Sequence, residues 1–276
     1  MRLIGCHVSI AGGVQNAPGR AAELGCEVFQ MFSRSPQGGP APELTPAVIK
    51  QFKAAMKEHR QAECYIHAPY YINFASDNNK IRHNSAKIVR EELERGSLLG
   101  AKYVMMHIGS AKGMTGKEAT TRAAKGLVRV MEGYKGLTEL LLEISAGTGD
   151  IIGDTFEELA EILEKSKMKG KVGVCLDSCH AFASGYDIRT REAMAETLET
   201  IEKTVGKSAI KLIHANDSKV ALGERRDRHD HIGAGHIGRA GFEHLMSVFN
   251  LDFVLETEHD KVEEDIKILK NIRDNI

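Results

Sequence analysis

Short apolar runs alternate with amphipathic stretches from one end of the chain to the other. The apolar runs have little polar interruption, which is typical of strands in a parallel sheet that is covered on its outer face. Eight strands are predicted, near residues 2–8, 26–32, 63–67, 102–107, 138–143, 172–177, 209–214 and 251–256. A segment with helical periodicity follows each strand, as at Ala86–Leu99, Thr155–Leu163 and Glu263–Arg273.

Glycine and capping residues mark where the predicted helices end and begin. Glycine adopts the left-handed conformation that closes a helix and lets the chain turn into a strand. Five strands are preceded by such a residue: Gly25, Gly100, Gly136, Gly170 and Gly206. Thr45-Pro46 predicts one helix start. Thr115 with Glu118, and Asp154 with Glu157, have the spacing of capping boxes.

Eight consecutive strand–helix units predict an α/β fold, and their number favours a closed barrel over an open, doubly wound sheet. The chain has 276 residues, close to the roughly 250 that a (β/α)₈ TIM barrel typically requires. Neither a linker nor a shift in composition divides it. We therefore expect one TIM-barrel domain spanning residues 1–276.

Composition narrows the function classes. The net charge of -1 gives no general support for binding nucleic acid. The longest apolar stretches are too short to span a bilayer, and the five cysteines form no disulfide framework, so we expect a cytoplasmic protein. The 12 histidines are more suggestive, because histidine is the commonest metal ligand.

The predicted ends of six consecutive strands carry residues that can bind a metal. In strand order they are His67, His107, Glu143, Asp177, His214 and Glu256. A barrel brings these ends together on the face where active sites are built. A single residue of this kind could be a structural accident, but six in succession predict a metal site at the carboxyl ends of the strands.

Two loops add further candidate ligands. His180 comes just after the sixth strand, and Asp227 and His229 follow the seventh. Imidazole and carboxylate together suit zinc, with manganese or iron as substitutes. Zinc usually takes about four ligands, so nine candidates indicate two or three ions. Cys175 and Cys179 flank Asp177, and a thiolate ligand there is a less favoured alternative. Clustered divalent metals predict a hydrolase, most readily one acting on phosphate.

The motifs at these positions resemble endonuclease IV, the family of zinc-dependent apurinic/apyrimidinic endonucleases. The resemblance runs nearly end to end, from His7-Val-Ser-Ile-Ala-Gly-Gly13 to Leu255-Glu-Thr257. Its most specific blocks are His67-Ala-Pro-Tyr70, Leu176-Asp-Ser-Cys-His-Ala-Phe-Ala-Ser-Gly-Tyr-Asp187, His214-Ala-Asn-Asp-Ser-Lys219 and Asp227-Arg-His229.

The resemblance implies three zinc ions, with Mn²⁺ as a substitute. His67, His107 and Glu143 would hold the first, and Glu143 would bridge to a second held by Asp177, His214 and Glu256. His180, Asp227 and His229 would hold the third. Glu143, Glu256 and His107 are expected to act in catalysis. The implied reaction cuts DNA 5′ to an abasic site, leaving a 3′-hydroxyl and a 5′-deoxyribose phosphate. The family also cleans blocked 3′ ends and is usually monomeric.

The implied partner is double-stranded DNA that carries abasic sites or blocked 3′ ends. Tyr71 and Ile72 match a loop that inserts into the base stack, with a hydrophobic plug between loops as the alternative. Lys219 and Arg228, together with Arg225 and Arg226, suit phosphate contacts, the alternative being an ordinary solvated loop.

Three positions depart from the family pattern. Ile144 and Ile108 stand where asparagine and proline are common, and the first change removes a side-chain hydrogen bond beside Glu143. Gln37 stands where some members insert an arginine into DNA, and Arg34 is expected to compensate by contacting the backbone.

Other interpretations remain open. A sugar isomerase or epimerase shares the barrel and binds one or two divalent metals, but it has no need of His180, Asp227 and His229. A noncatalytic protein that binds abasic DNA is less favoured, because all nine candidate ligands are intact. Gly233-Ala-Gly235-His-Ile-Gly238 spells a dinucleotide-binding motif, but it follows a polar loop instead of a strand and is rejected. His7 is expected to form hydrogen bonds without binding a metal.

Overall fold

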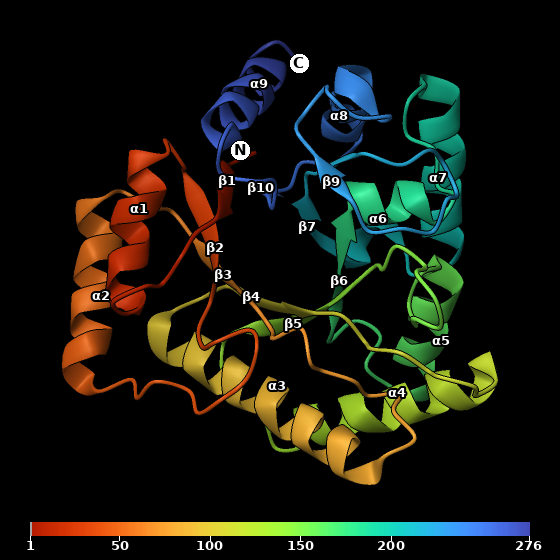
Figure 1. Cartoon of the computed structure of the whole chain (residues 1–276), viewed down its shortest axis with the longest axis horizontal. Coiled ribbons are helices and arrows are strands. Elements are labelled where there is room, and N and C mark those ends of the chain that lie inside the picture. The colour runs from red at the N-terminus through yellow and green to blue at the C-terminus, as the bar shows by residue number, and fades with distance from the viewer. Residues whose placement is uncertain (1) are drawn as a thin grey trace.

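Eight parallel strands close into a barrel with helices around its outside in the computed structural model, which describes residues 2–276 (Figure 1). The strands follow one another around the barrel in chain order, and the last pairs with the first. They are β1 (Ile4–His7), β2 (Val28–Phe32), β3 (Cys64–His67), β4 (Tyr103–Met106), β5 (Glu139–Glu143), β6 (Gly173–Asp177), β7 (Ile210–His214) and β10 (Phe253–Leu255). The predicted TIM barrel is confirmed.

A helix follows every strand of the barrel, as the periodicity predicts. The helices are α1 (Ala17–Glu23), α2 (Pro46–Glu58), α3 (Asn79–Leu99), α4 (Gly116–Met131), α5 (Phe156–Lys165), α6 (Ser178–Ala183), α7 (Arg191–Lys203), α8 (Gly238–Val248) and α9 (Val262–Asp274). Two 3₁₀ turns, Val14–Asn16 and Lys207–Ala209, precede α1 and β7. Helix α3 begins seven residues before the predicted start, because Asn78 caps it by accepting a hydrogen bond from the Lys80 amide. No helix among residues 2–276 is long and apolar enough to cross a membrane.

The helix caps confirm two of the three predicted starts. The side chains of Thr45 and Thr115 accept hydrogen bonds from the amides at the third helical positions of α2 and α4. The third prediction is wrong by one residue. Thr155 caps α5 and accepts from the amide of Glu158, and the same three-residue spacing fits this pair equally well. Asp154 is buried and forms an ion pair with Arg225.

Four of the six predicted strand-end residues do end their strands, namely His67, Glu143, Asp177 and His214. His107 and Glu256 instead lie one residue beyond β4 and β10. The reason is that backbone pairing stops at Met106 and Leu255, so the ladder is one residue shorter than the apolar run. Both side chains nevertheless face the barrel axis with the others.

The interior of the barrel has two layers, which follow from the two-residue alternation of strand side chains. The lower layer is apolar and consists of Val28, Tyr65, Tyr103, Met105, Leu141, Cys175, Leu212 and Val254. Beneath it, the hydroxyl of Tyr65 donates to Asp252 Oδ2 at 2.6 Å. The upper layer, at the carboxyl ends, consists of His7, Gln30, His67, His107, Glu143, Asp177, His214 and Glu256. A larger apolar core separates the strands from the surrounding helices.

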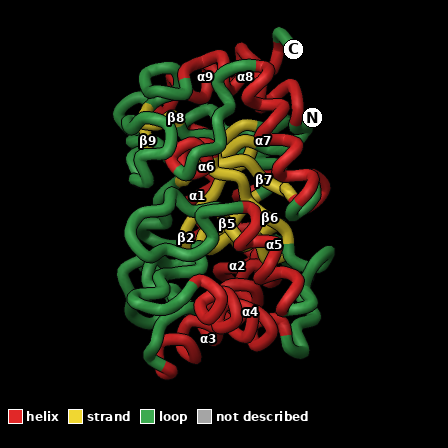
Figure 2. Tube along the Cα trace, turned by 90° about the vertical axis from the view of Figure 1, so that its right-hand side faces the viewer, coloured by secondary structure: helices red, strands yellow, loops and turns green. Residues whose placement is uncertain are grey.

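The loops at the carboxyl ends form one face of the molecule. Figure 2 shows many of these loops in green along the left-hand side, with helices at the top, on the right and at the bottom. The longest excursion follows β7 and contains a two-stranded antiparallel sheet, β8 (Asp217–Ser218) with β9 (His229–Asp230). This hairpin carries residues 219–228 over the upper layer and returns His229 to it.

Candidate metal centre

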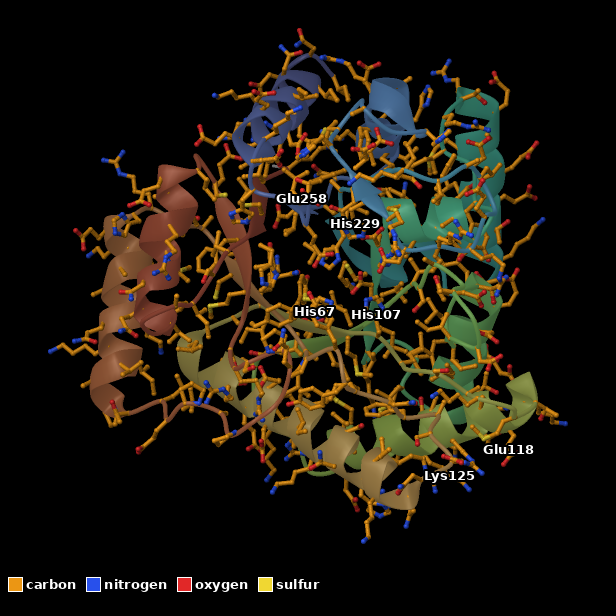
Figure 3. The ribbon with its side chains drawn as sticks, viewed as in Figure 1. His67, His107, Glu118, Lys125, His229 and Glu258 are labelled. Atoms are coloured by element: carbon orange, nitrogen blue, oxygen red, sulfur yellow. The ribbon has the colours of Figure 1, made fainter. Side chains whose placement is uncertain are left out.

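The structure brings the nine predicted ligands together in the three predicted groups. The donor atoms within each group lie within 4.8 Å of one another. The groups are His67, His107 and Glu143; then Glu143, Asp177, His214 and Glu256; and finally His180, Asp227 and His229. In Figure 3, His67, His107 and His229 lie near the centre of the ring of helices. Strands that are distant in sequence therefore contribute to one site.

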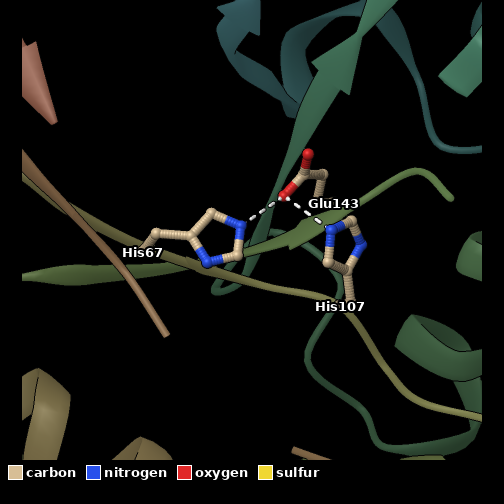
Figure 4. A group of neighbouring side chains, drawn as sticks. All are labelled: His67, His107 and Glu143. Carbon is tan, nitrogen blue, oxygen red and sulfur yellow. Dashed lines mark hydrogen bonds and ion pairs between the residues drawn. The ribbon is translucent and has the colours of Figure 1, made fainter. Parts of the chain in front are cut away.

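Glu143 links the first two groups. Its Oε2 atom lies 3.0 Å from His67 Nε2 and 3.6 Å from His107 Nε2. Dashed lines mark these two contacts in Figure 4. Its Oε1 atom lies 2.9 Å from His214 Nδ1 in the second group. The carboxylate is fully buried at the end of β5, so each oxygen is directed to a different set of imidazoles. This geometry suits a bridging ligand.

The second group surrounds His214 with carboxylates. Glu256 Oε2 and Asp177 Oδ2 lie 3.4 Å and 3.9 Å from His214 Nδ1. Asp177 has a second role, because its Oδ1 accepts the amide of His180 at 2.8 Å and so caps α6. The cap fixes the start of the helix that carries the first residue of the third group.

The third group is assembled from α6 and the β8–β9 excursion. Asp227 Oδ1 lies 3.2 Å from His180 Nε2 and 3.3 Å from His229 Nε2. The two Nε2 atoms are themselves 3.3 Å apart. Asp227 is the most open of the nine ligands, with 54% of its side chain exposed, whereas His180 is buried. This group is therefore the one nearest to an incoming substrate.

The hydrogen bonds of three histidines direct a lone pair into the cluster. The Nδ1 atoms of His67, His180 and His229 lie 2.6, 3.0 and 3.5 Å from the main-chain oxygens of Ala68, Ile144 and Glu256. A carbonyl oxygen can only accept, so Nδ1 carries a proton, and in the neutral imidazole that binds a metal Nε2 is left as the ligand. Facing lone pairs repel each other unless a cation lies between them. The donor set of imidazole nitrogens and carboxylate oxygens thus fits zinc.

The pKa values of the buried carboxylates and imidazoles also favour the binding of cations. Burial alone would raise the pKa of Glu143, but His107 and His214 hold that pKa well below its usual range. Burial also opposes ionisation of Glu256, yet His214 lowers its pKa to about 2. For His180, burial lowers the pKa, but Asp177, Asp227 and Glu143 outweigh burial and raise it to about 10. The site therefore keeps its carboxylates ionised and attracts positive charge.

Two amide side chains that the sequence interpretation missed support the ligands. Gln30 is fully buried and contacts His7, His214 and Glu256. Asn216 donates to Asp177 Oδ2 at 2.7 Å and accepts the amide of Glu256 at 2.8 Å. One sequence signal could have identified Gln30, since it is the single polar residue in the strand Val28–Phe32.

The predicted DNA-inserting loop is divided between exposed and buried residues. Tyr70 is 69% exposed, Tyr71 is partly buried, and Ile72 is only 4% exposed within the apolar core. The burial of Ile72 favours the hydrophobic plug for that residue. The aromatic side chain presented at the rim is Tyr70, which the sequence interpretation assigned only to a motif.

Arg34 does not face the site as expected. Its guanidinium is 4% exposed and forms ion pairs with Glu91 and Glu92 on α3. Ser33 donates to the same Glu92 at 2.6 Å, so the pair anchors the loop after β2 to α3. Gln37, farther along this loop, is exposed. Moving the Arg34 guanidinium to contact DNA would break both ion pairs and leave Glu92 and Glu91 only the longer ones with Arg95 and Lys87, at 4.0 and 3.8 Å.

The basic segment after β8 has two kinds of residue. Lys219, Arg226 and Arg228 are exposed. Arg225 is exposed as well, but it pairs with Asp154 and donates through Nε to the Gly147 oxygen at 3.0 Å, which fastens the segment to the loop after β5. Three of the four basic residues are thus free for phosphate contacts.

The rejected dinucleotide motif has a structural role. The amides of Gly233, Ile237 and Gly238 donate to the buried carboxylate of Asp217 at 2.9–3.1 Å. A Cβ atom on Gly235 would lie 2.5 Å from Asp217 Oδ1, so glycine is required there for close approach. The motif surrounds a carboxylate of the chain itself, and it holds the excursion in place.

Ile144, Cys175 and Cys179 lie close in the chain to the candidate ligands Glu143 and Asp177. Ile144 packs in the core outside the barrel, and its main-chain oxygen accepts a hydrogen bond from His180 Nδ1. Cys175 lies one layer below Asp177, as the alternation predicts. Cys179 approaches Asp177 and His229, but burial raises the pKa of its thiol and so disfavours a thiolate ligand.

Two cavities meet at the cluster of candidate ligands. One of about 410 Å³ is lined by six histidines together with Tyr70, Asp227, Glu256 and Thr257. The other, of about 650 Å³, extends from Tyr70–Asn73 to Arg226–Arg228. They share Tyr70, His107, His180 and Asp227. A substrate bound across both would pass directly over the three groups.

Known proteins resemble this chain over its full length. Residues 18–272 match the family described as xylose isomerase-like TIM barrel. A protein of Methanoculleus marisnigri named probable endonuclease 4 is 37% identical, with 99% of each chain covered. The crystal structure of endonuclease IV from Thermus thermophilus has a TM-score of 0.86 at 31% identity, covering 99% of this chain and 100% of that one. A D-tagatose 3-epimerase-like protein, with a TM-score of 0.76 over 99% of this chain and 97% of that one, is 21% identical and shares the fold.

Proposed function

The chain belongs to the endonuclease IV family of xylose isomerase-like TIM barrels, and from that premise we propose that it cuts DNA at abasic sites with three zinc ions. Family membership makes it a nuclease and a hydrolase. The proposal adds the substrate and the metal count. The product would carry a 3′-hydroxyl on one side and a 5′-deoxyribose phosphate on the other. One chain, acting as a monomer and a single domain, would suffice.

The observation that carries the proposal is the grouping of nine candidate ligands, all but Asp227 buried or partly buried, into three sets. When bound, zinc ions supply a water of lowered pKa and positive charge that stabilises a phosphoryl group under attack. Glu143 would bridge the first two sets, with Glu256 and His107 completing the region around the attacked phosphorus. Mn²⁺ suits the same donors and would substitute.

The third group distinguishes a phosphodiesterase from the sugar epimerases that share the barrel. Asp227 lies where the two cavities join, and Arg226 and Arg228 line the larger one. A phosphodiester carries a negative charge that these arginines would neutralise, whereas a neutral sugar has no such charge. Three ligand sets also exceed what the epimerisation of one sugar requires.

Selection of abasic sites would depend on the cost of moving a nucleotide out of the duplex. A nucleotide without a base has little stacking to lose, so it enters a cavity more readily than an intact one. The exposed ring of Tyr70, with Tyr71 beside it, would occupy the vacated stack. Lys219 and Arg228 would hold the phosphates on either side.

The same machinery would remove blocking groups from 3′ ends. A blocked 3′ end presents a phosphoester of the same chemistry to the same ligands, without a following nucleotide to accommodate. We therefore propose 3′-end cleaning as a second activity. It would depend on the same metals and on the same carboxylates.

The test is cleavage of a labelled duplex with one abasic analogue, beside an undamaged duplex, before and after exhaustive chelation. We expect a single cut 5′ to the analogue, lost on chelation and restored by zinc. A metal-replete protein that bound the abasic duplex without cutting it would instead be a noncatalytic binding protein. A protein that neither bound nor cut the duplex, but epimerised sugars with Mn²⁺, would overturn the proposal.

A further inference from the structure

Gln30 lies at the centre of the upper layer and makes no hydrogen bond to the main chain through its side chain. It is fully buried in β2. Its Oε1 atom lies 2.7 Å from His214 Nε2, and its Nε2 atom donates to Glu256 Oε1 at 2.6 Å. The same Nε2 atom lies 3.0 Å from His7 Nδ1. All of its partners therefore belong to the metal cluster or its border.

The orientation of this amide is fixed by chemistry. The ionised carboxylate of Glu256 can only accept hydrogen bonds, so the atom of Gln30 that faces it at 2.6 Å must be the nitrogen. The oxygen then faces His214. The opposite orientation would bring two acceptor oxygens together in a buried site.

The fixed amide in turn determines which nitrogen of His214 is protonated. Because Gln30 Oε1 can only accept, the neutral imidazole of His214 must carry its proton on Nε2. The lone pair is then on Nδ1, which lies 2.9 Å from Glu143 Oε1 and 3.4 Å from Glu256 Oε2. His214 thus differs from His67, His180 and His229, which direct Nε2 into the cluster.

We propose that Gln30 is a positioning residue for the second metal group. It keeps the proton of His214 on Nε2, so that Nδ1 is the ligand atom, and it holds Glu256 beside this imidazole. This inference rests on the proposed metal-dependent function, and it assigns a role to a side chain that touches no substrate. Loss of a partner that orients a ligand typically weakens metal binding by about 10–100-fold. The effect should be confined to the second of the three groups.

Gln30→Met tests the proposal because methionine has a similar length and can neither donate nor accept as Gln30 does. The purified zinc-bound protein is challenged with graded concentrations of a chelator, and the remaining zinc is measured by elemental analysis. We expect one zinc of three to be lost at about 10–100-fold lower chelator strength than in the unsubstituted chain. The other two should be retained as before.

Gln61→Met is the matched control. Gln61 is also a buried glutamine, but its side chain donates to the main-chain oxygens of Cys26 and His59, and neither residue is one of the nine candidate ligands. Its substitution should lower thermal stability without changing the zinc titration. If Gln30→Met behaved like Gln61→Met, or lost all three zincs together, the positioning role would be overturned.

A second measurement needs no substitution and therefore does not depend on a variant folding. Long-range proton–nitrogen NMR of the zinc-bound chain reports which nitrogen of each histidine carries a proton. We expect one zinc-bound histidine, His214, to be protonated at Nε2. We expect His67, His180 and His229 to be protonated at Nδ1. Finding every ligand histidine protonated at Nδ1 would overturn the proposal, whether or not the chain cleaves abasic DNA.

Discussion

The two layers of the barrel interior lie on the same strands but differ in chemistry, since one is apolar and the other carries ionised groups. Leu141 and Glu143 are two residues apart on β5, and both are fully buried. The lower layer stabilises the barrel by removing apolar surface from water. The upper layer places ionised carboxylates and imidazoles in a buried site, which is costly unless the charges are paired. The layer that stabilises the barrel and the layer that carries the chemistry are thus only two residues apart on the inner face of a strand.

Glu143→Gln should produce the largest effect on the chemistry. The amide keeps the shape of the side chain but removes the charge shared by two metal groups. We expect activity on an abasic duplex to fall by about 10³-fold, the scale of losing a preorganised electrostatic group. Zinc content, measured on the same sample, should fall as well. Full zinc occupancy with unchanged cleavage would show that Glu143 is not a bridging ligand.

Leu141→Ala should reverse this pattern and affect stability instead of chemistry. Leu141 is fully buried in the lower layer, and its truncation leaves a cavity. We expect the free energy of unfolding to fall by about 2–5 kcal/mol in denaturant titrations. The zinc content should be unchanged at temperatures where the variant is folded. Selective loss of zinc with no loss of stability would contradict the division between the layers.

The pH dependence of zinc binding should sharpen the comparison further. The carboxylates around His180 raise its pKa to about 10 in the protein without metal. That raised value stabilises the metal-free fold below the ordinary pKa of about 6.5 and is lost as pH rises through about 10. A proton must leave before zinc binds, so affinity should rise by up to about tenfold per pH unit in this interval.

Calorimetric titration with zinc at several pH values, together with thermal melting of the metal-free chain, measures both trends. Asp227→Asn provides the control, because removing this charge should lower the pKa of His180 and flatten the dependence. A metal-free chain that became more stable between pH 7 and pH 10 would contradict the assigned direction.

Arg228→Ala should give the smallest effect, since this exposed residue lies outside both layers. It should weaken duplex binding a few-fold and reduce the slope of log affinity against log salt by about 0.9, the value for one phosphate contact. Lys125→Ala is the matched control, because this exposed lysine lies on α4 away from the metal cluster (Figure 3). Equal slopes for the two variants would show that Arg228 makes no contact with the DNA phosphates.

The alternation of apolar runs and helices could be translated into a barrel because each signal is local. An apolar run of five residues and a helix-closing glycine can each be identified from a few adjacent residues, without knowing what they contact in space. The same reasoning predicted six of the nine candidate ligands, since the carboxyl end of every barrel strand reaches one face, and the other three were predicted from the loops that follow. The errors of one residue at His107 and Glu256 arose where the pattern continues past the last backbone hydrogen bond of the strand. The error at Thr155 arose because two adjacent residue pairs have the spacing of a capping box.

Side chains whose role depends on distant partners could not be assigned in this way. The sequence by itself determined the eight strand–helix units, the candidate metal ligands that the fold brings together and the family to which the chain belongs. Only the tertiary structure decided that Arg34 is bound to Glu92, that Tyr70 and not Ile72 stands at the rim, and that Gln30 orients His214. The physical reason is that hydrogen bonds and ion pairs act over about 3 Å, and strands that are far apart in the chain reach that distance only when the barrel closes.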